Sequence, residues 1–191
     1  MLEAVQQRVS DRKFRLFLCA VCRNRWNVMT DQHSRATVEV AAKLAAGIVD
    51  EFELDQARMA ALEGTRRIDR ADSRSRHEAL SAVRLVEIVL EKHIAAGDWW
   101  NLEDESDGCS LLRDIFGNPF RPVTLDPRWL TPDVVEIAKA IYEDRAFDRM
   151  PILSDALVDA GCDNEDIINH CRGDGPHVRG CWVVDLILGK A

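Results

Sequence analysis

Apolar residues recur every three or four positions along most of the chain, which is the spacing of amphipathic helices. The first such stretch carries Phe14, Phe17 and Val21 on one side and most of its arginines on the other. In the second stretch, a narrow stripe of small residues favours a close helix crossing. The spacing predicts four helices in the first half of the chain, over residues 12–29, 33–47, 53–62 and about 80–97, with Thr30 and Asp31 capping the second and Gly64 ending the third.

Prolines and capping residues mark the elements of the second half. Pro119, Pro122 and Pro127 forbid a continuous helix or a central strand, so we expect an extended connection there. Thr131 followed by Pro132 is a typical helix start. The pattern predicts helices over 110–116, from Thr131 through Tyr142, from Pro151 to Gly161, after the acidic segment 163–166, and from Pro176 to Leu188.

Long alternating segments and hairpin turns are missing from the sequence, which therefore predicts an all-α protein. We expect a compact multi-helix domain of about eight or nine helices in two packed halves. A segment with five acidic residues and no basic one marks the boundary between the halves. The predicted organisation is an N-terminal helical half at 1–97, an acidic connector at 98–107 and a C-terminal helical half at 108–191, together forming one continuous globular unit.

Composition narrows the class of protein. The chain has 191 residues, of which 47% are hydrophobic and 30% charged, and this excludes a disordered chain. A net charge of -8 argues against general binding to nucleic acid or to anionic membranes. The N-terminus lacks the apolar core of a signal peptide, and no apolar run is long enough to cross a membrane. The sequence thus predicts a cytoplasmic protein with no membrane segment and with reduced cysteines.

Four long motifs resemble a known group of sequences. They read RKFRLFLCAVCRNRW, LRDIFGNPFRPVTLDPRWLTP, IYEDRAFDRMPILSDALVDAGCDNEDIINHC and GPHVRGCWVVDLILGK. Together they resemble an uncharacterised multi-copy protein family of Gemmata-type planctomycetes, over about residues 12–190. The resemblance implies family membership alone, because no activity, cofactor or catalytic residue comes with it.

The most site-like pattern lies near the C-terminus, where Cys162, His170, Cys171, His177 and Cys181 form a C-x7-HC-x5-H-x3-C arrangement. Zinc takes four thiolate or imidazole ligands in a tetrahedron, and Cys162, His170, His177 and Cys181 are the candidate set. His177 and Cys181 would share one face of the final predicted helix. The spacing matches no standard zinc finger or ribbon, so the simpler interpretation is that Cys171 and Cys181 pack in the core and the histidines cap helix ends.

Two further cysteines, Cys19 and Cys22, form a C-x2-C pair. Redox pairs of this kind lie at helix N-termini, where the helix dipole lowers the thiol pKa. Here the pair lies about two turns inside the first predicted helix, which favours core packing. We find none of the common glycine-rich, nucleophile or metalloprotease motifs elsewhere in the chain.

Trp99 and Trp100 stand in the acidic connector, where they would either cover the core as a lid or anchor a partner. With no catalytic motif in view, the sequence favours a protein-binding or scaffolding module without catalytic activity and without a cofactor, acting on a protein partner that it does not identify. The alternative is a zinc-binding protein or a metal-dependent hydrolase that uses the C-terminal Cys/His cluster. A catalytic zinc would keep an open position for water, whereas a structural zinc would have four protein ligands.

Overall fold

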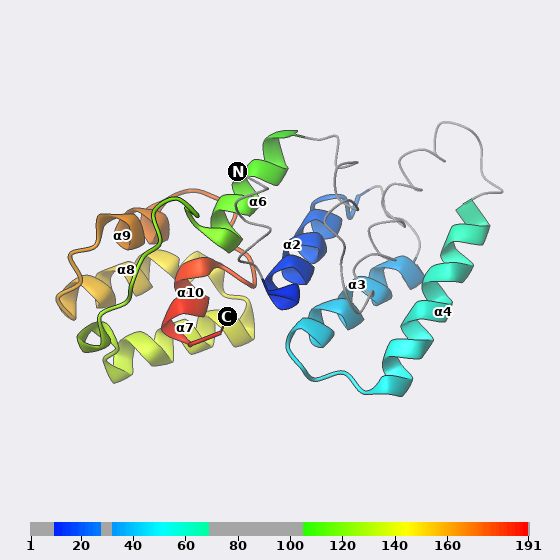
Figure 1. Cartoon of the computed structure of the whole chain (residues 1–191), viewed down its shortest axis with the longest axis horizontal. Helices are drawn as coiled ribbons and strands as arrows, with labels where there is room; N and C mark the ends of the chain where they lie inside the picture. Colours follow the sequence, from blue (N-terminus) through cyan, green and yellow to red (C-terminus); the bar gives the residue numbers. More distant parts are fainter. Residues whose placement is uncertain (1–9, 28–31, 69–104, 191) are drawn as a thin grey trace. The chain divides into compact units, whose positions relative to one another are not determined.

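The computed structural model describes residues 10–27, 32–68 and 105–190 (Figure 1). All regular structure within these ranges is helical, so the all-α prediction is confirmed. The described chain divides into two compact units, one extending up to Gly108 and the other starting at Cys109. The helix expected over 80–97 lies outside the described residues, as do Trp99 and Trp100.

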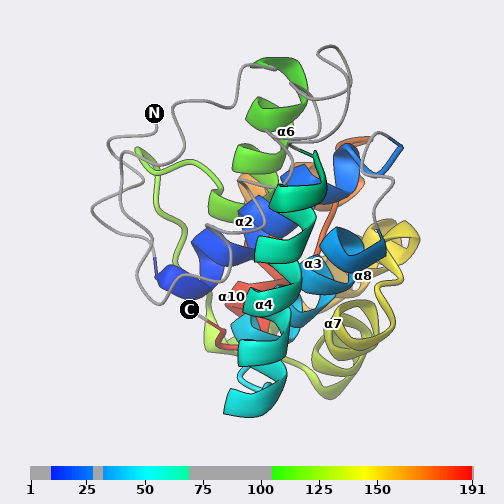
Figure 2. The ribbon, with the colours of Figure 1, turned by 90° about the vertical axis from the view of Figure 1, so that its right-hand side faces the viewer.

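The N-terminal unit contains three described helices, α2 (Asp11–Asn24), α3 (Gln32–Ala45) and α4 (Glu51–Ile68). Helix α3 packs against both α2 and α4 (Figure 2). The Ser10 hydroxyl accepts a hydrogen bond from the Lys13 N–H and so caps α2. Cys19 and Cys22 are fully buried on α2, where they serve as small core residues.

Helix α4 continues past Gly64 to Ile68, so the predicted stop at this glycine is wrong. A glycine ends a helix by adopting a left-handed conformation just after the last turn. Gly47, which follows α3, does so with a φ of 71°, whereas Gly64 keeps a helical backbone. An interior glycine costs about 1 kcal/mol relative to alanine, and that cost alone does not terminate a long helix.

The C-terminal unit contains the end of α6 (Glu105–Phe116) and four further helices. Helix α7 packs against α8 and α10, and α9 contacts both α8 and α10. The bounds are α7 Pro132–Asp144, α8 Met150–Asp159, α9 Glu165–Arg172 and α10 Trp182–Ile187, with single 3-10 turns at Pro127–Trp129 and Phe147–Arg149.

Side-chain caps explain where two of these helices start. The Thr131 hydroxyl accepts from the Val134 N–H at 3.4 Å, and Pro132 follows as the first helical residue, as the sequence predicts. The Asn164 side chain accepts from the Ile167 N–H at 3.1 Å at the start of α9. Acidic residues in the first turn of α9 also suit the helix dipole.

The final helix starts at Trp182 and not at Pro176, so that prediction is wrong by six residues. The segment 176–181 is a loop for two physical reasons. The Val178 N–H donates to the carboxylate of Asp114 at 2.9 Å, which takes it out of any helical ladder. Gly180 has a φ of 103°, outside the helical region. His177 and Cys181 therefore do not share a helix face.

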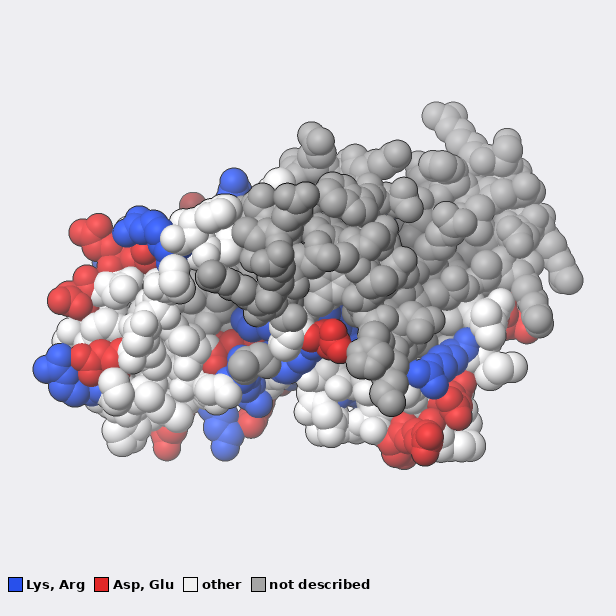
Figure 3. Space-filling model, viewed as in Figure 1, with Lys and Arg blue, Asp and Glu red and all other residues white. Residues whose placement is uncertain are grey.

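Charged residues on the described part of the surface are interspersed, with blue and red side by side on the face drawn in Figure 3. Several arginines of the C-terminal unit lie next to a carboxylate, as in the pairs Arg128–Asp126, Arg172–Asp155 and Arg121–Asp166. Exposed pairs of this kind contribute little to stability. Among the described helices, none is long and apolar enough to cross a membrane.

We expect the core of the C-terminal unit to depend strongly on Leu153, which is fully buried on α8. Leu153→Ala should reduce the free energy of unfolding by about 2–5 kcal/mol, because it removes buried methyl groups and leaves a cavity. Ile152→Ala is the matched control, since the neighbouring Ile152 side chain is 55% exposed and should cost well under half as much. Urea titrations followed by circular dichroism measure both. Equal losses for the two variants would contradict the assigned packing of α8.

Candidate metal centre

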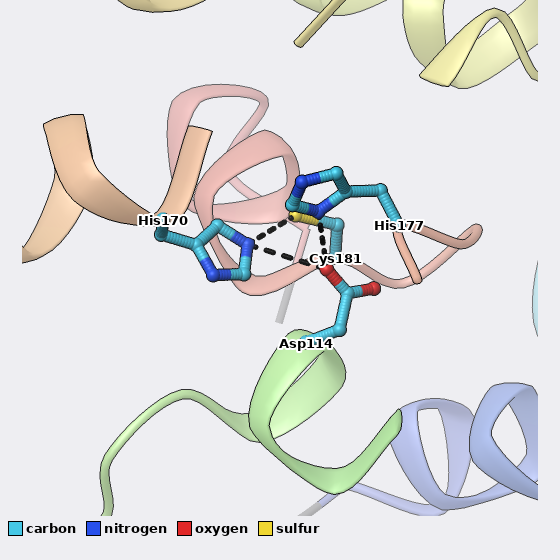
Figure 4. A group of neighbouring side chains, drawn as sticks. All are labelled: Asp114, His170, His177 and Cys181. Carbon is cyan, nitrogen blue, oxygen red and sulfur yellow. Dashed lines mark hydrogen bonds and ion pairs between the residues drawn. The ribbon is translucent and has the colours of Figure 1, made fainter. Parts of the chain in front are cut away.

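Four chemically suitable side chains meet at one place in the C-terminal unit (Figure 4). Asp114 projects from the last turn of α6, and His170 from α9. His177 lies in the loop that follows α9, and Cys181 immediately precedes α10. One ligand atom from each residue can be chosen so that all four atoms lie within 4.8 Å of one another.

The distances within this group are short. His170 Nε2 lies 3.1 Å from Cys181 Sγ and 3.2 Å from Asp114 Oδ1. His177 Nδ1 lies 2.8 Å from the same Oδ1. Zinc–ligand bonds of about 2.0–2.3 Å in a tetrahedron place neighbouring donor atoms about 3.3–3.7 Å apart. The four donors are thus within a few tenths of an ångström to about 1 Å of the spacing that a zinc ion would impose.

Outer contacts hold two of these side chains in the required orientation. His177 presents its other ring nitrogen, Nε2, to the Gly173 carbonyl at 3.2 Å. The second carboxylate oxygen of Asp114 accepts from the Val178 N–H at 2.9 Å. In metal sites, ligating histidines typically donate their second N–H to a carbonyl or carboxylate, and ligating carboxylates are hydrogen-bonded in turn. The surroundings of His177 and Asp114 match this pattern.

Aromatic packing fixes the third side chain. The His170 ring contacts the Trp182 ring, with ring centroids 5.2 Å apart. The His170 and His177 rings meet edge-on, with centroids 4.9 Å apart. Since Trp182 is the first residue of α10 and Cys181 comes just before it, the same turn of chain supplies a ligand and a wall for the site.

The group is almost closed to solvent. The side chain of Asp114 is 3% exposed, that of His177 9% and that of His170 16%, and Cys181 is fully buried. A buried charge needs partners that compensate for lost hydration. Around Asp114, the two histidines and a backbone N–H provide them.

These contacts shift the ionisation of three groups. Burial by itself opposes ionisation of Asp114, but hydrogen bonds from His170, His177 and the Val178 N–H outweigh it and lower the pKa of the carboxyl group. Burial likewise opposes a charge on His177, yet its hydrogen bond to Asp114 raises the pKa of the imidazole. Burial and the negative charge of Asp114 raise the pKa of the Cys181 thiol well above its usual range.

Three of the four ligands expected from the sequence, His170, His177 and Cys181, belong to this group. Cys162 does not belong to it. Cys162, Cys171 and Cys181 all pack in the apolar core of the unit, as the other interpretation of the sequence proposed for Cys171 and Cys181, but only Cys181 is also a member of the donor group. Asp114 fills the fourth position.

Asp114 was missed because it lies far from the other ligands in the sequence. One signal was present in the pattern of α6. Leu111 and Ile115 are buried on this helix, and a carboxylate between them, three residues after Leu111, falls on the apolar side. A charged residue on a buried face indicates a specific partner.

A cysteine, a histidine and an aspartate in contact also invite comparison with a nucleophilic triad. In a triad the histidine uses one ring nitrogen for the nucleophile and the other for the carboxylate. Here the same nitrogen, His170 Nε2, faces both Cys181 and Asp114. The thiol is also fully buried, which leaves no approach for a substrate. The arrangement is that of donors converging on one point, as in a metal site.

Comparisons with known proteins add no function to this geometry. No family model matches the chain, and neither the curated proteins nor the solved structures yielded a similar one. The resemblance to a planctomycete family therefore stays a prediction. The chemistry of the candidate metal centre is consequently argued from its own donor atoms.

Proposed function

We propose that the C-terminal unit binds one zinc ion through Asp114, His170, His177 and Cys181. The observation that supports this proposal is the convergence of four donors, from α6, α9 and the loop before α10, within 4.8 Å of one another in a nearly closed site. Carboxylate, imidazole and thiolate are the three ligand types that zinc uses in proteins.

The charges of the four donors also favour a divalent cation such as zinc. A divalent cation with one carboxylate, one thiolate and two neutral imidazoles has a net charge of zero. Burial penalises net charge, so a neutral cluster suits a site as closed as this one. The mixed donor set, with one soft sulfur ligand, also disfavours magnesium and calcium, which take oxygen ligands.

We further propose that the zinc is structural. Four protein donors complete a tetrahedron, whereas a catalytic zinc has three protein ligands and keeps a position open for water. The hydrolase alternative is therefore the weaker of the two zinc hypotheses. A structural zinc is compatible with a binding or scaffolding module, because it stabilises a fold without taking part in a reaction.

Zinc binding should depend on Cys181 and not on Cys162. Protein purified without an affinity tag should contain about one zinc per chain by elemental analysis. Cys181→Ser should weaken zinc binding at least about hundredfold, because it removes the thiolate ligand. Cys162→Ser is the matched control, because Cys162 is buried in the same apolar core as Cys181 but is not a member of the donor group, and the zinc affinity of this variant should be unchanged.

A cobalt-substituted sample gives a second measurement of the same ligand set. Tetrahedral Co(II) absorbs strongly in the visible range, and a thiolate ligand adds a charge-transfer band in the near ultraviolet. This band should be present in the Cys162→Ser variant and absent from Cys181→Ser. A chain that takes up neither zinc nor cobalt, or whose Co(II) spectrum survives Cys181→Ser, would overturn the proposed site.

Zinc affinity should rise with pH, because binding displaces protons. At pH 6.5 the metal-free site holds a proton on the Cys181 thiol, whose pKa is raised well above its usual range. More than half of the His177 side chains are protonated, because the pKa of this imidazole is raised above its ordinary 6.5, and Asp114, whose pKa is lowered, is ionised. Binding should then release between one and two protons from these two groups, and the apparent association constant should increase between about tenfold and about hundredfold per pH unit. The proton count should fall towards one as pH rises through the pKa of His177.

Calorimetry in buffers of different ionisation enthalpy measures this proton count. Cys162→Ser should release the same number of protons as the unaltered protein. A binding enthalpy that does not vary with the buffer would show that the thiol and the imidazole are not ligands.

A further inference from the structure

Among the residues that the structure describes, the apolar core cluster that unites α7, α8, α9 and α10 has no member from α6. Its buried and partly buried members lie between Val123 and Leu188, whereas α6 ends at Phe116. Leu111 and Ile115 of α6 are buried, but neither belongs to this core cluster. The packing that unites α7, α8, α9 and α10 therefore does not by itself fix the position of α6 in the unit.

Polar contacts at Asp114 join α6 to the later helices. The carboxylate bonds to His177 and to the Val178 N–H, which are 63 and 64 residues further along the chain, and it also contacts His170. One turn after Asp114, the backbone of Gly117 lies against the Trp182 ring. The contacts of Asp114 with the two histidines belong to the candidate metal centre (Figure 4).

The four proposed ligands are unevenly distributed between α6 and the later helices of the unit. His170, His177 and Cys181 lie within a short stretch whose helices, α9 and α10, contact each other. Asp114 alone comes from α6. A metal bound to all four would thus form a direct bond between α6 and the rest of the unit.

We propose that zinc binding fixes α6 to the C-terminal helices, so that occupancy of the site controls how firmly α6 is held. The proposal rests on the zinc-binding function proposed above. Detachment of α6 removes Asp114 from the metal and leaves three ligands behind. By thermodynamic reciprocity, zinc must then stabilise the attached α6 by the same factor by which Asp114 strengthens zinc binding.

This reciprocity can be measured by hydrogen exchange on the full chain, with and without saturating zinc. Backbone amides of residues 110–117 should exchange about 10–100-fold more slowly with zinc, the usual range for the loss of one contributing group at a metal site. The Gly117 N–H, which donates to the Arg113 carbonyl in the last turn of α6, is a suitable probe. Amides of α3, in the other unit, serve as an internal reference.

Two variants distinguish the attachment of α6 from the binding of zinc. Asp114→Asn keeps the size of the side chain and should lose zinc affinity by the same 10–100-fold factor. With zinc bound, residues 170–182 of this variant should still gain protection, whereas residues 110–117 should not. Asp155→Asn is the matched control, because Asp155 is an exposed acid in the same unit and pairs with Arg172 at the surface. It should behave as the unaltered protein.

The possible outcomes are distinguishable. Protection of both segments in the unaltered protein, with loss of the α6 effect in Asp114→Asn, supports the proposal. Zinc-dependent protection confined to residues 170–182 in the unaltered protein overturns it while the zinc-binding function stands. No zinc uptake at all overturns both. The first comparison uses the unaltered chain, so it is decisive even if Asp114→Asn does not fold.

Discussion

The carboxylate of Asp114 is the group around which the candidate metal centre is arranged. It is buried, and hydrogen bonds from two imidazoles and a backbone N–H outweigh the effect of burial and lower its pKa. Because the buried carboxylate needs hydrogen-bond donors, segments that are far away in the sequence have to lie beside it. The loop after α9 must present Val178 and His177 to it, which delays the start of α10 to Trp182. One buried charge thus accounts for the loop, the position of Cys181 and the assembly of the donor group.

Local sequence signals were enough to predict most of the described helices. Thr131 and Pro132 mark the start of α7 because capping acts within one turn, and the period of apolar residues is likewise a local property. Two of the errors in the predicted helix bounds have long-range or cumulative causes. The start of α10 is set by a carboxylate more than sixty residues away, and α4 passes Gly64 because one glycine does not outweigh the rest of a long helix.

The candidate site was only partly predictable for a similar reason. Cys162 and Cys181 are both buried, and as small sulfur-containing residues they look alike in a sequence. What separates them is their partners: Cys181 faces His170, whereas Cys162 lies among apolar side chains. Such a difference depends on tertiary contacts, and the missing ligand, Asp114, could be recognised in advance only as a charge on an apolar helix face.

Gly117 extends the constraint beyond the residues that carry donor atoms. It has a φ of 64°, and a Cβ atom placed there would lie 3.2 Å from the Trp182 ring, which in turn packs against His170. A larger residue would both strain the turn after α6 and push this ring towards the ligand. Gly117 therefore constrains the geometry of the site although it has no functional group of its own.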